Sequence, residues 1–401
     1  MITILIIILL LPAAILFVVA LFFLIEIIGA YLPLRKSASL RSELGSIAVV
    51  IPAHNEGDGI VPTIADIQSQ LRDMDRLILV ADNCDDDTAE IARANGAECL
   101  ERVDLQKRGK GYALQFALDF LADRPPAVVF FVDADCRLEK EAIKTTCTAA
   151  LDENRPAQAL YLMKAAPDAG PQRRVAEFAW ALMNKVRMSG LFTLFDTTRL
   201  TGSGMALPWT LAKELDVGGG EIVEDLALAL DMVRRGSAPI FVPDACVTSE
   251  FPQSDEAAVK QRARWEHGSI SLARRNLASL FLSGFQHGDI RRSAMALDLA
   301  IPPLSLFAFL LMAMFGISVI ALIFGISILL KVSVTALLMF AISVMLAWFK
   351  IGRDILPLSA LSEVVGYVFS KHQIYGEDAR QSTKTWTRTE RANETPPKQE
   401  G

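Results

Sequence analysis

The stretch AVVFFVDADCRLEK, from Ala127 to Lys140, joins an apolar run typical of a buried strand to a pair of acids. The apolar residues Val128 to Val132 end in Asp133 and Asp135. Two carboxylates this close raise each other's cost of ionisation unless a cation lies between them. Aspartate is also common in ordinary strand-to-loop turns. The pair alone therefore leaves a turn and a cation site as alternatives, and the surrounding sequence must decide.

Outward from this stretch, strand-like and helix-like segments alternate between Ser46 and about Gln253. Predicted strands cover residues 46–53, 76–82 and about 97–100, and predicted helices cover 60–71, 85–96 and 111–121. This alternation predicts a parallel, doubly wound α/β sheet that binds its ligand outside the carboxyl ends of the strands. Since Asp82, Asp133 and Asp135 each lie at the end of a predicted strand, we expect them in one crevice.

Three uncharged apolar runs lie outside this region, at residues 1–25, 301–330 and 332–349. Runs of 18 or more such residues indicate transmembrane helices. A cleaved signal peptide is the alternative for the first run, but it lacks a basic start and is too long. Lysine and arginine cluster on one side of the runs, and only Lys331 lies on the other, which predicts an external N-terminus and a cytoplasmic central segment. The basic residues on the cytoplasmic side are Arg35, Lys36, Arg41, Arg291, Arg292, Lys350 and Arg353.

These patterns predict the domain order along the 401 residues. A transmembrane helix (1–30) precedes a cytosolic domain (46–270), interfacial helices (271–300) and two transmembrane helices (301–350). An amphipathic interfacial segment (354–372) and a cytosolic tail (373–401) follow; a fourth span in place of that segment would move the tail to the outside. The expected location is the bacterial inner membrane, with the central domain facing the cytoplasm.

Charge and cysteine content exclude two classes of protein. The formal net charge of −6 gives no basic balance that would favour nucleic acid as a partner. The five cysteines show no paired or metal-type spacing, which fits a reducing cytosol without a disulfide framework. They are Cys84, Cys99, Cys136, Cys147 and Cys246.

Acidic residues gather at three points. Asp82 precedes a run of three acids, Asp85 to Asp87, of which helix capping explains one or two, so Asp82 is the better candidate for a ligand's polar edge. Asp133 and Asp135 offer oxygen ligands, which suit Mg²⁺ or Mn²⁺ and not zinc. Glu224 and Asp225 precede an apolar helical run, where an ordinary helix start is the alternative.

Basic, glycine-rich and aromatic groups supply three further candidate segments. In DLQKRGKGYAL, basic residues flank two glycines at a predicted helix start, which favours an anion, although a solvated basic turn is the alternative. TGSG brings either a close backbone approach or a simple turn. In QRARW, arginine can bind phosphate and tryptophan can pack on a sugar ring; an interfacial Trp–Arg pair is the alternative. The residues are Lys107, Arg108, Lys110, Gly202, Ser203, Gly204, Gln261, Arg264 and Trp265.

Seven motifs in order, VVIPAHNE, VADNCDD, KRGKG, VDADC, TGSGMAL, VED and QRARW, resemble those of the membrane-bound family-2 glycosyltransferases, the group that includes cellulose and hyaluronan synthases. The resemblance spans about Ser46 to His267, and the tail KTWTRTER resembles a signature of exopolysaccharide members. KRGKG departs from the family pattern because it lacks the Asn before Gly-Lys.

The resemblance implies a nucleotide-sugar-binding GT-A fold, a doubly wound mixed sheet, between transmembrane helices. It implies an α-linked donor, expected to be a UDP-sugar, whose base and ribose are held by Pro52, Ala53, Asn55, Glu56 and Asp82. Asp133 and Asp135 would meet the metal, Mn²⁺ or Mg²⁺, and the diphosphate. Asp225 would be the catalytic base. The remaining donor-binding residues would be Lys110, Gly202, Ser203, Gly204, Glu224, Gln261, Arg264 and Trp265.

The expected reaction is a single displacement that inverts the anomeric carbon and gives a β-linkage on a lipid-linked or growing polysaccharide acceptor, with polysaccharide-assembly proteins as further partners. A non-catalytic nucleotide-sugar-binding membrane protein is the alternative, but it would need no base at Asp225. A nucleotidyltransferase would need a basic glycine-rich loop after the first strand, where the chain has the acidic PAHNEGDG. QRARW favours polymer synthesis, whereas three spans favour single additions.

Overall fold

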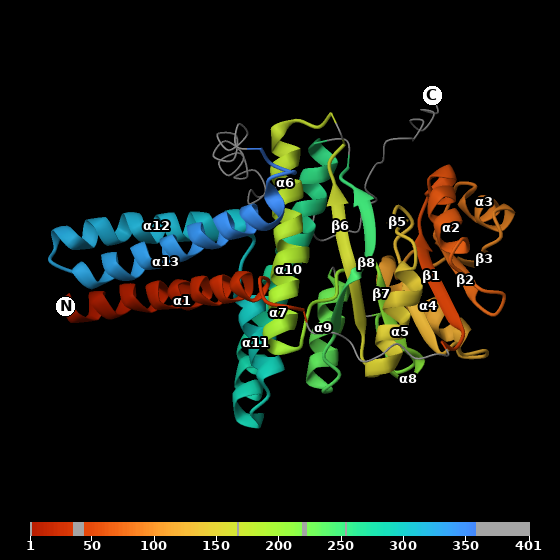
Figure 1. The fold of residues 1–401 in the computed structure, drawn as a ribbon, viewed down its shortest axis with the longest axis horizontal. Helices are drawn as coiled ribbons and strands as arrows, with labels where there is room; N and C mark the ends of the chain where they lie inside the picture. Colours follow the sequence, from red (N-terminus) through yellow and green to blue (C-terminus); the bar gives the residue numbers. More distant parts are fainter. Residues whose placement is uncertain (1, 35–43, 167, 219–222, 253–254, 358–401) are drawn as a thin grey trace. The chain divides into compact units, whose positions relative to one another are not determined.

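The computed structural model describes residues 2–34, 44–166, 168–218, 223–252 and 255–357 (Figure 1). The chain divides into two compact units. Among the described residues, with the gaps just given, the sheet unit comprises residues 44–168 and 199–269, and the helical unit comprises residues 2–34, 169–198 and 270–357. Each unit has a core of its own.

The sheet unit is built on an eight-stranded mixed sheet in its described residues, with the strand order β3-β2-β1-β4-β7-β6-β8-β5. The first four strands of this order are parallel, while β7 is antiparallel to both β4 and β6. The expected doubly wound mixed sheet is therefore confirmed. The strands are β1 (Ile47–Ala53), β2 (Arg76–Asp82), β3 (Glu98–Arg102), β4 (Val128–Phe131), β5 (Arg137–Leu138), β6 (Ala157–Lys164), β7 (Met205–Pro208) and β8 (Ile240–Glu250).

Helices surround this sheet. Alternate residues of β1, β2, β4 and β7 pack with α4 and α9 in one buried apolar cluster, because successive side chains of a strand point to opposite faces. β1 is buried on both faces, as expected for a parallel strand that is covered on both sides. The helices of this unit are η1 (Gly57–Ile60), α2 (Val61–Gln68), α3 (Thr88–Ala94), α4 (Lys110–Leu121), α5 (Ala142–Glu153), α8 (Trp209–Ala212), α9 (Glu224–Arg234) and the first part of α10 (Asp255–His287).

Strand register brings the predicted acids to one edge. Ala53 of β1 pairs with Ala81 of β2, and Val50 of β1 pairs with Phe131 of β4. The carboxyl ends of these three parallel strands therefore open onto the same side of the sheet, which is where such sheets bind ligands. Asp82 ends β2, and Asp133 follows β4.

The helical unit contains three helices in its described part that are long and apolar enough to cross a membrane: Leu9–Gly29, Leu304–Ile323 and Ser327–Gly352. The prediction of three such helices is confirmed, but Lys331 lies inside the third helix and not before it. Figure 1 shows α1, α12 and α13 side by side. The helices are α1 (Ile2–Gly29), α6 (Pro171–Ala181), η2 (Leu182–Arg187), α7 (Met188–Phe195), the end of α10, α11 (Ile290–Ala300), α12 (Leu304–Ile323), α13 (Ser327–Ala347) and η3 (Trp348–Gly352).

A buried ion cluster joins three segments of the helical unit. The Arg187 guanidinium lies 2.6 Å from a carboxylate oxygen of Glu26 and 2.7 Å from one of Asp298, and all three side chains are buried. Removing one member of such a cluster typically costs about 3–5 kcal/mol, because a buried charge is left uncompensated. The amphipathic segment predicted at 354–372 and the tail at 373–401 lie almost entirely outside the described residues, which end at 357.

Candidate active site

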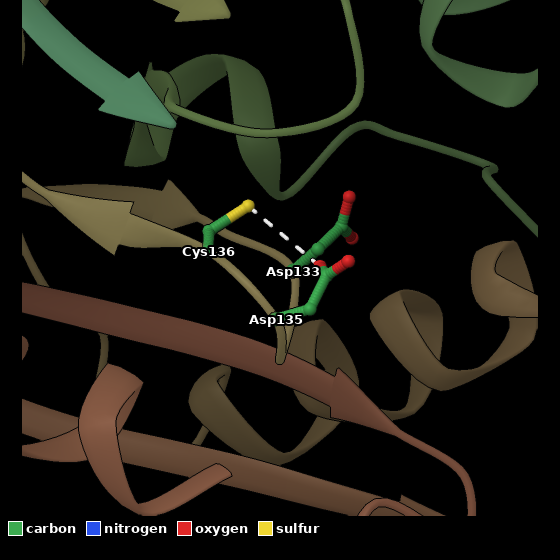
Figure 2. A group of neighbouring side chains, drawn as sticks. All are labelled: Asp133, Asp135 and Cys136. Atoms are coloured by element: carbon green, nitrogen blue, oxygen red, sulfur yellow. Dashed lines mark hydrogen bonds between the residues drawn. The ribbon is translucent and has the colours of Figure 1, made fainter. Parts of the chain in front are cut away.

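The turn after β4 presents the two aspartates of the opening motif (Figure 2). Oxygens of Asp133 and Asp135, together with Cys136 Sγ, lie within 4.8 Å of one another. Two partly buried carboxylates at this spacing fit a divalent cation that prefers oxygen ligands. Burial, together with the charges of Asp135 and Asp133, raises the pKa of the Cys136 thiol well above its usual value. The thiol therefore stays protonated beside the two acids.

The loop 201–204 packs against this turn. Ser203 Oγ accepts a hydrogen bond from the Asp133 N–H at 3.1 Å and lies 3.1 Å from Cys136 Sγ. Gly202 has a φ of +83°, and a Cβ atom there would lie 3.2 Å from both Lys110 Nζ and Asp225 Oδ2. Of the two alternatives for TGSG, a close backbone approach is therefore the one that the structure shows.

Lys110 lies at the centre of the acids. Its Nζ is 2.5 Å from Asp133 Oδ1, donates to Gly202 O at 2.7 Å, and lies 3.9 Å from Glu224 Oε1. Burial acts to lower the pKa of Lys110, but the carboxylates of Asp133, Glu224 and Asp225 outweigh it and raise the pKa above its usual value. The ammonium therefore remains charged. The sequence marks Lys110 as a donor-binding candidate and gives no sign of these contacts with the acids.

Glu224 and Asp225 lie in the first turn of α9, directly before the apolar helical run that the sequence indicates. No side chain caps the start of this helix at Val223, and Asp225 Oδ1 accepts a hydrogen bond from the Leu226 N–H at 2.8 Å. Burial raises the pKa of Glu224 to about 7, with Lys110 opposing and Asp225 adding to the rise. Burial also raises the pKa of Asp225, against the effect of Lys110. This coupled pair can take up a proton near neutral pH, the property that a general base needs.

The ends of β1 and β2 form a polar rim. Asp82 Oδ1 accepts hydrogen bonds from Arg102 Nη1 at 2.6 Å and from Asn83 Nδ2 at 3.0 Å. His54 Nδ1 lies 2.6 Å from the Asp82 carbonyl oxygen. The carboxylate is thus held by a cation from the neighbouring strand. Arg102 carried no signal in the sequence, because a lone arginine at a strand end is usually solvated.

The segment after β1 is fixed by residues that follow β2. Asn55 has a φ of +53°. Its side-chain Nδ2 donates to the Asp85 carboxylate, and its side-chain Oδ1 accepts from the Asp85 N–H at 2.9 Å. The N–H groups of Glu56 and Gly57 both donate to Thr88 Oγ1 at 2.9 Å. Pro52 and Ala53 are the last residues of β1. The predicted nucleotide-binding residues thus share this edge.

The motif QRARW lies on α10, within the sheet unit. Gln261, Arg264 and Trp265 are three and four residues apart and so share one helix face. Burial lowers the pKa of Arg264, and the carboxylate of Glu224 partly offsets this. The charge of Arg264 therefore lies within electrostatic reach of the acid pair.

Comparison with known proteins places this geometry in a family. The sequence pattern described as Glycosyltransferase like family 2 matches residues 45–268, which contain all of the residues above. The chain belongs to this family. A family relative from Bacillus subtilis (strain 168), named Probable glycosyltransferase YdaM, is 24% identical over 253 residues, which are 60% of this chain. The chain spans 59% of that relative's length.

One solved glycosyltransferase structure shares the fold over most of the chain, and a second one is similar over about half of it. A mannosyltransferase from Pyrobaculum calidifontis, solved with GDP-Man and Mn²⁺, covers 85% of this chain and 96% of its own, with 17% identity and a TM-score of 0.51. Glucosyl-3-phosphoglycerate synthase from Mycobacterium tuberculosis, solved with Mn²⁺, UDP and phosphoglyceric acid, covers 54% of this chain and 75% of its own, with 23% identity and a TM-score of 0.39. The GT-A-like fold implied by the motifs is confirmed.

Proposed function

We propose that this protein is an inverting membrane glycosyltransferase that moves a sugar from a nucleotide-sugar donor to a hydroxyl of its acceptor. One observation carries the proposal: a carboxylate pair suited to a divalent cation, a charged lysine and a buried acid pair that can accept a proton lie together at one sheet edge. Asp133, Lys110 and Glu224 form this arrangement through the contacts of the lysine ammonium. Membership of family 2 supports it.

Asp133 and Asp135 are the residues that would hold Mn²⁺ or Mg²⁺. A cation at this position neutralises the negative charge of a leaving diphosphate. Lys110 adds a second positive charge from the start of α4 and is fixed by the Gly202 carbonyl. Arg264, with its planar donors, would complete the recognition of the diphosphate. Gln261 and Trp265, on the same face of α10, would lie beside the acceptor.

Asp225 is the proposed base. It would take the proton of the acceptor hydroxyl as that oxygen attacks the anomeric carbon. The buried setting that raises its pKa makes the carboxylate a better proton acceptor than an exposed aspartate. A single displacement inverts the configuration, so an α-linked donor would give a β-linkage. A module that only bound nucleotide sugar, for regulation or export, would have no use for this buried acid pair.

Asp82 is the proposed contact for the nucleotide base, with a UDP-sugar as the donor. The Asp82 carboxylate, held by Arg102, would accept a hydrogen bond from the imide N–H of uracil. Asn55, Glu56 and the end of β1 would line the ribose side.

The proposed acceptor is a lipid-linked molecule or a growing polysaccharide. The transfer is proposed to take place at the cytoplasmic face of a bacterial inner membrane. The three apolar helices support membrane association. The end of α10 and α11 are proposed to lie along the membrane surface. Figure 1 shows α11 running across the direction of α1, α12 and α13. Large apolar side chains are exposed here, at Phe281, Leu282, Phe285 and Ile290.

Membranes containing the protein, incubated with a panel of radiolabelled nucleotide sugars, test this function. We expect label from one donor to enter lipid or polymer, and Asp225→Asn membranes to lose that transfer. Nucleotide binding without transfer from any donor, in membranes supplied with native lipid acceptors, would favour the binding-only alternative.

A further inference from the structure

Gln158 is a fully buried glutamine in β6 that holds the loop 201–204 from behind. Its Oε1 accepts a hydrogen bond from the Thr201 N–H at 2.8 Å. Its Nε2 donates to the carbonyl oxygens of Ser203 and Ala159, both at 2.8 Å. The one side-chain amide thus bonds the loop backbone with both a donor and an acceptor.

The Gln158 side-chain amide bonds the loop at the point where the pairing of β6 with β7 ends. The β6–β7 ladder pairs Ala157 with Ala206 and Gln158 with Met205, and a last bond joins Ala159 N–H to Gly204 O at 2.8 Å. Beyond this point the loop has left the strand, and the Gln158 side chain takes the place of a backbone partner. Polar backbone groups in a buried position are costly to leave unpaired.

The other side of the same loop touches the functional groups. Ser203 Oγ accepts from the Asp133 N–H at 3.1 Å, and Gly202 O accepts from Lys110 Nζ at 2.7 Å. The Cα of Gly202 lies so close to Asp225 that a Cβ atom would be 3.2 Å from its Oδ2. A shift of this loop therefore moves the partners of Lys110 and Asp133 together.

We propose that Gln158 is a positioning residue for the transfer reaction, fixing the loop 201–204 so that Asp133 and Lys110 hold the geometry needed for the metal and the diphosphate. The proposal rests on the proposed function of Asp133 and Asp135 as cation ligands. Gln158 itself is buried beneath the loop and bonds its backbone at Thr201 and Ser203. Its effect on Asp133 and Lys110 is therefore passed on through Ser203 and Gly202 of the loop.

The first test compares Gln158→Met with Thr146→Val. Methionine keeps the length of the side chain and removes its hydrogen bonds. Thr146 is a matched control: it is buried in the same unit, and its hydroxyl donates to the Ala142 carbonyl of its own helix, away from the loop 201–204. Both variants should lower the melting temperature, but Gln158→Met alone should weaken Mn²⁺ binding in the presence of UDP by roughly tenfold, the size of one lost hydrogen-bond contribution. Electron paramagnetic resonance on the full-length protein measures this binding.

The second test uses Gln158→Glu, which preserves the shape. A carboxylate would turn an acceptor toward the Ser203 and Ala159 carbonyls, whereas a protonated acid can donate to one of them. We expect Mn²⁺ affinity and kcat, each relative to wild type at the same pH, to be low at neutral pH and to recover as the pH falls. A purely structural role would change the melting temperature with pH and leave the relative Mn²⁺ affinity flat.

The outcomes separate this proposal from the proposed function. If wild-type protein binds Mn²⁺ and Asp135→Ala abolishes binding, the cation site stands, and equal Mn²⁺ affinity of Gln158→Met and Thr146→Val would overturn the role of Gln158. If wild-type protein binds no Mn²⁺ in the presence of nucleotide, the cation site itself fails. Should the Gln158 variants not fold, Ser203→Ala removes the acceptor of the Asp133 N–H and must reproduce the Mn²⁺ defect; normal Mn²⁺ affinity there would also overturn the proposal.

Discussion

Lys110 Nζ lies 2.5 Å from Asp133 Oδ1, so the ammonium already neutralises one of the two carboxylates proposed to hold a cation. A divalent cation at Asp133 would be repelled by this ammonium until an anion, such as a diphosphate, joins the two positive charges. Metal and nucleotide are therefore expected to bind cooperatively. The contact places Lys110 of KRGKG beside the proposed cation site.

Lys110→Met tests that coupling. Removing the ammonium should tighten Mn²⁺ binding to the nucleotide-free protein by roughly tenfold, since a like charge within about 4 Å is lost. It should at the same time weaken UDP binding, because the diphosphate loses a cationic partner. Calorimetric titration with Mn²⁺ alone and with UDP in saturating Mn²⁺ measures both. Weaker Mn²⁺ binding in the variant would mean that the lysine supports the site and does not compete for it.

Chelation tests the carboxylate pair directly. Sugar transfer should be lost in excess chelator and return on addition of Mn²⁺ or Mg²⁺, the cations that prefer oxygen ligands. Asp135→Ala should weaken donor binding, because the diphosphate loses its bridge to the protein. Glu139→Ala is a suitable control, since Glu139 lies only a few residues further along the chain, outside the acidic group. Full turnover in excess chelator would contradict the metal role.

The raised pKa of Glu224 predicts how stability changes with pH. The pKa of about 7 means that the folded protein holds this proton up to about pH 7, whereas the unfolded chain releases it near the ordinary glutamate pKa of 4.5. Between these values the folded state binds more protons, so the free energy of unfolding should fall as the pH rises, by about 3 kcal/mol at most. Thermal unfolding from about pH 5 to about pH 8 should show this fall.

Glu224→Gln is the matched comparison, since glutamine does not titrate. The variant should be more stable than wild type above about pH 7, and the difference should shrink toward about pH 5. Parallel curves for the two proteins across this range would show that Glu224 does not hold the extra proton.

The acids at the strand ends could be predicted from sequence because they follow from strand periodicity. Asp82, Asp133 and Asp135 each end an apolar run, and parallel strands open to one edge. The antiparallel insertion of β7 could not be predicted, because a four-residue strand between a glycine-rich loop and a short helix has no distinctive pattern. Contacts between residues far apart in the sequence could not be predicted either, because tertiary packing sets them. These contacts are Gln158 with Ser203, Lys110 with Asp133 and Arg102 with Asp82.

The contact of Arg102 with Asp82 leads to a prediction about UDP binding. Arg102→Ala should weaken UDP binding by roughly tenfold, because Asp82 loses the partner that fixes its carboxylate, an effect of the size expected for a charge-assisted hydrogen bond. Arg76→Ala is the control. Arg76 pairs with Glu98 across the same two strands at 2.9 Å, but the Glu98 side chain is 44% exposed, and such surface pairs contribute little. Equal UDP affinity in the two variants would remove Asp82 and Arg102 from base recognition.

Asp225→Asn separates the catalytic from the structural interpretation of the acid pair. The hydrogen bond from the Leu226 N–H to Asp225 Oδ1 can be accepted by the asparagine carbonyl, so α9 should form and the protein should fold. Asparagine cannot accept a proton at neutral pH, and transfer should therefore fall by roughly 10²–10⁴-fold, the usual contribution of general-base catalysis. UDP binding in the presence of Mn²⁺ should stay close to wild type, because Asp133, Asp135 and Lys110 are unchanged. Calorimetry for binding and a product assay for transfer measure the two effects on the same preparation. Transfer near the wild-type rate would make Asp225 an ordinary residue of a helix start and leave the proton of the acceptor hydroxyl to Glu224.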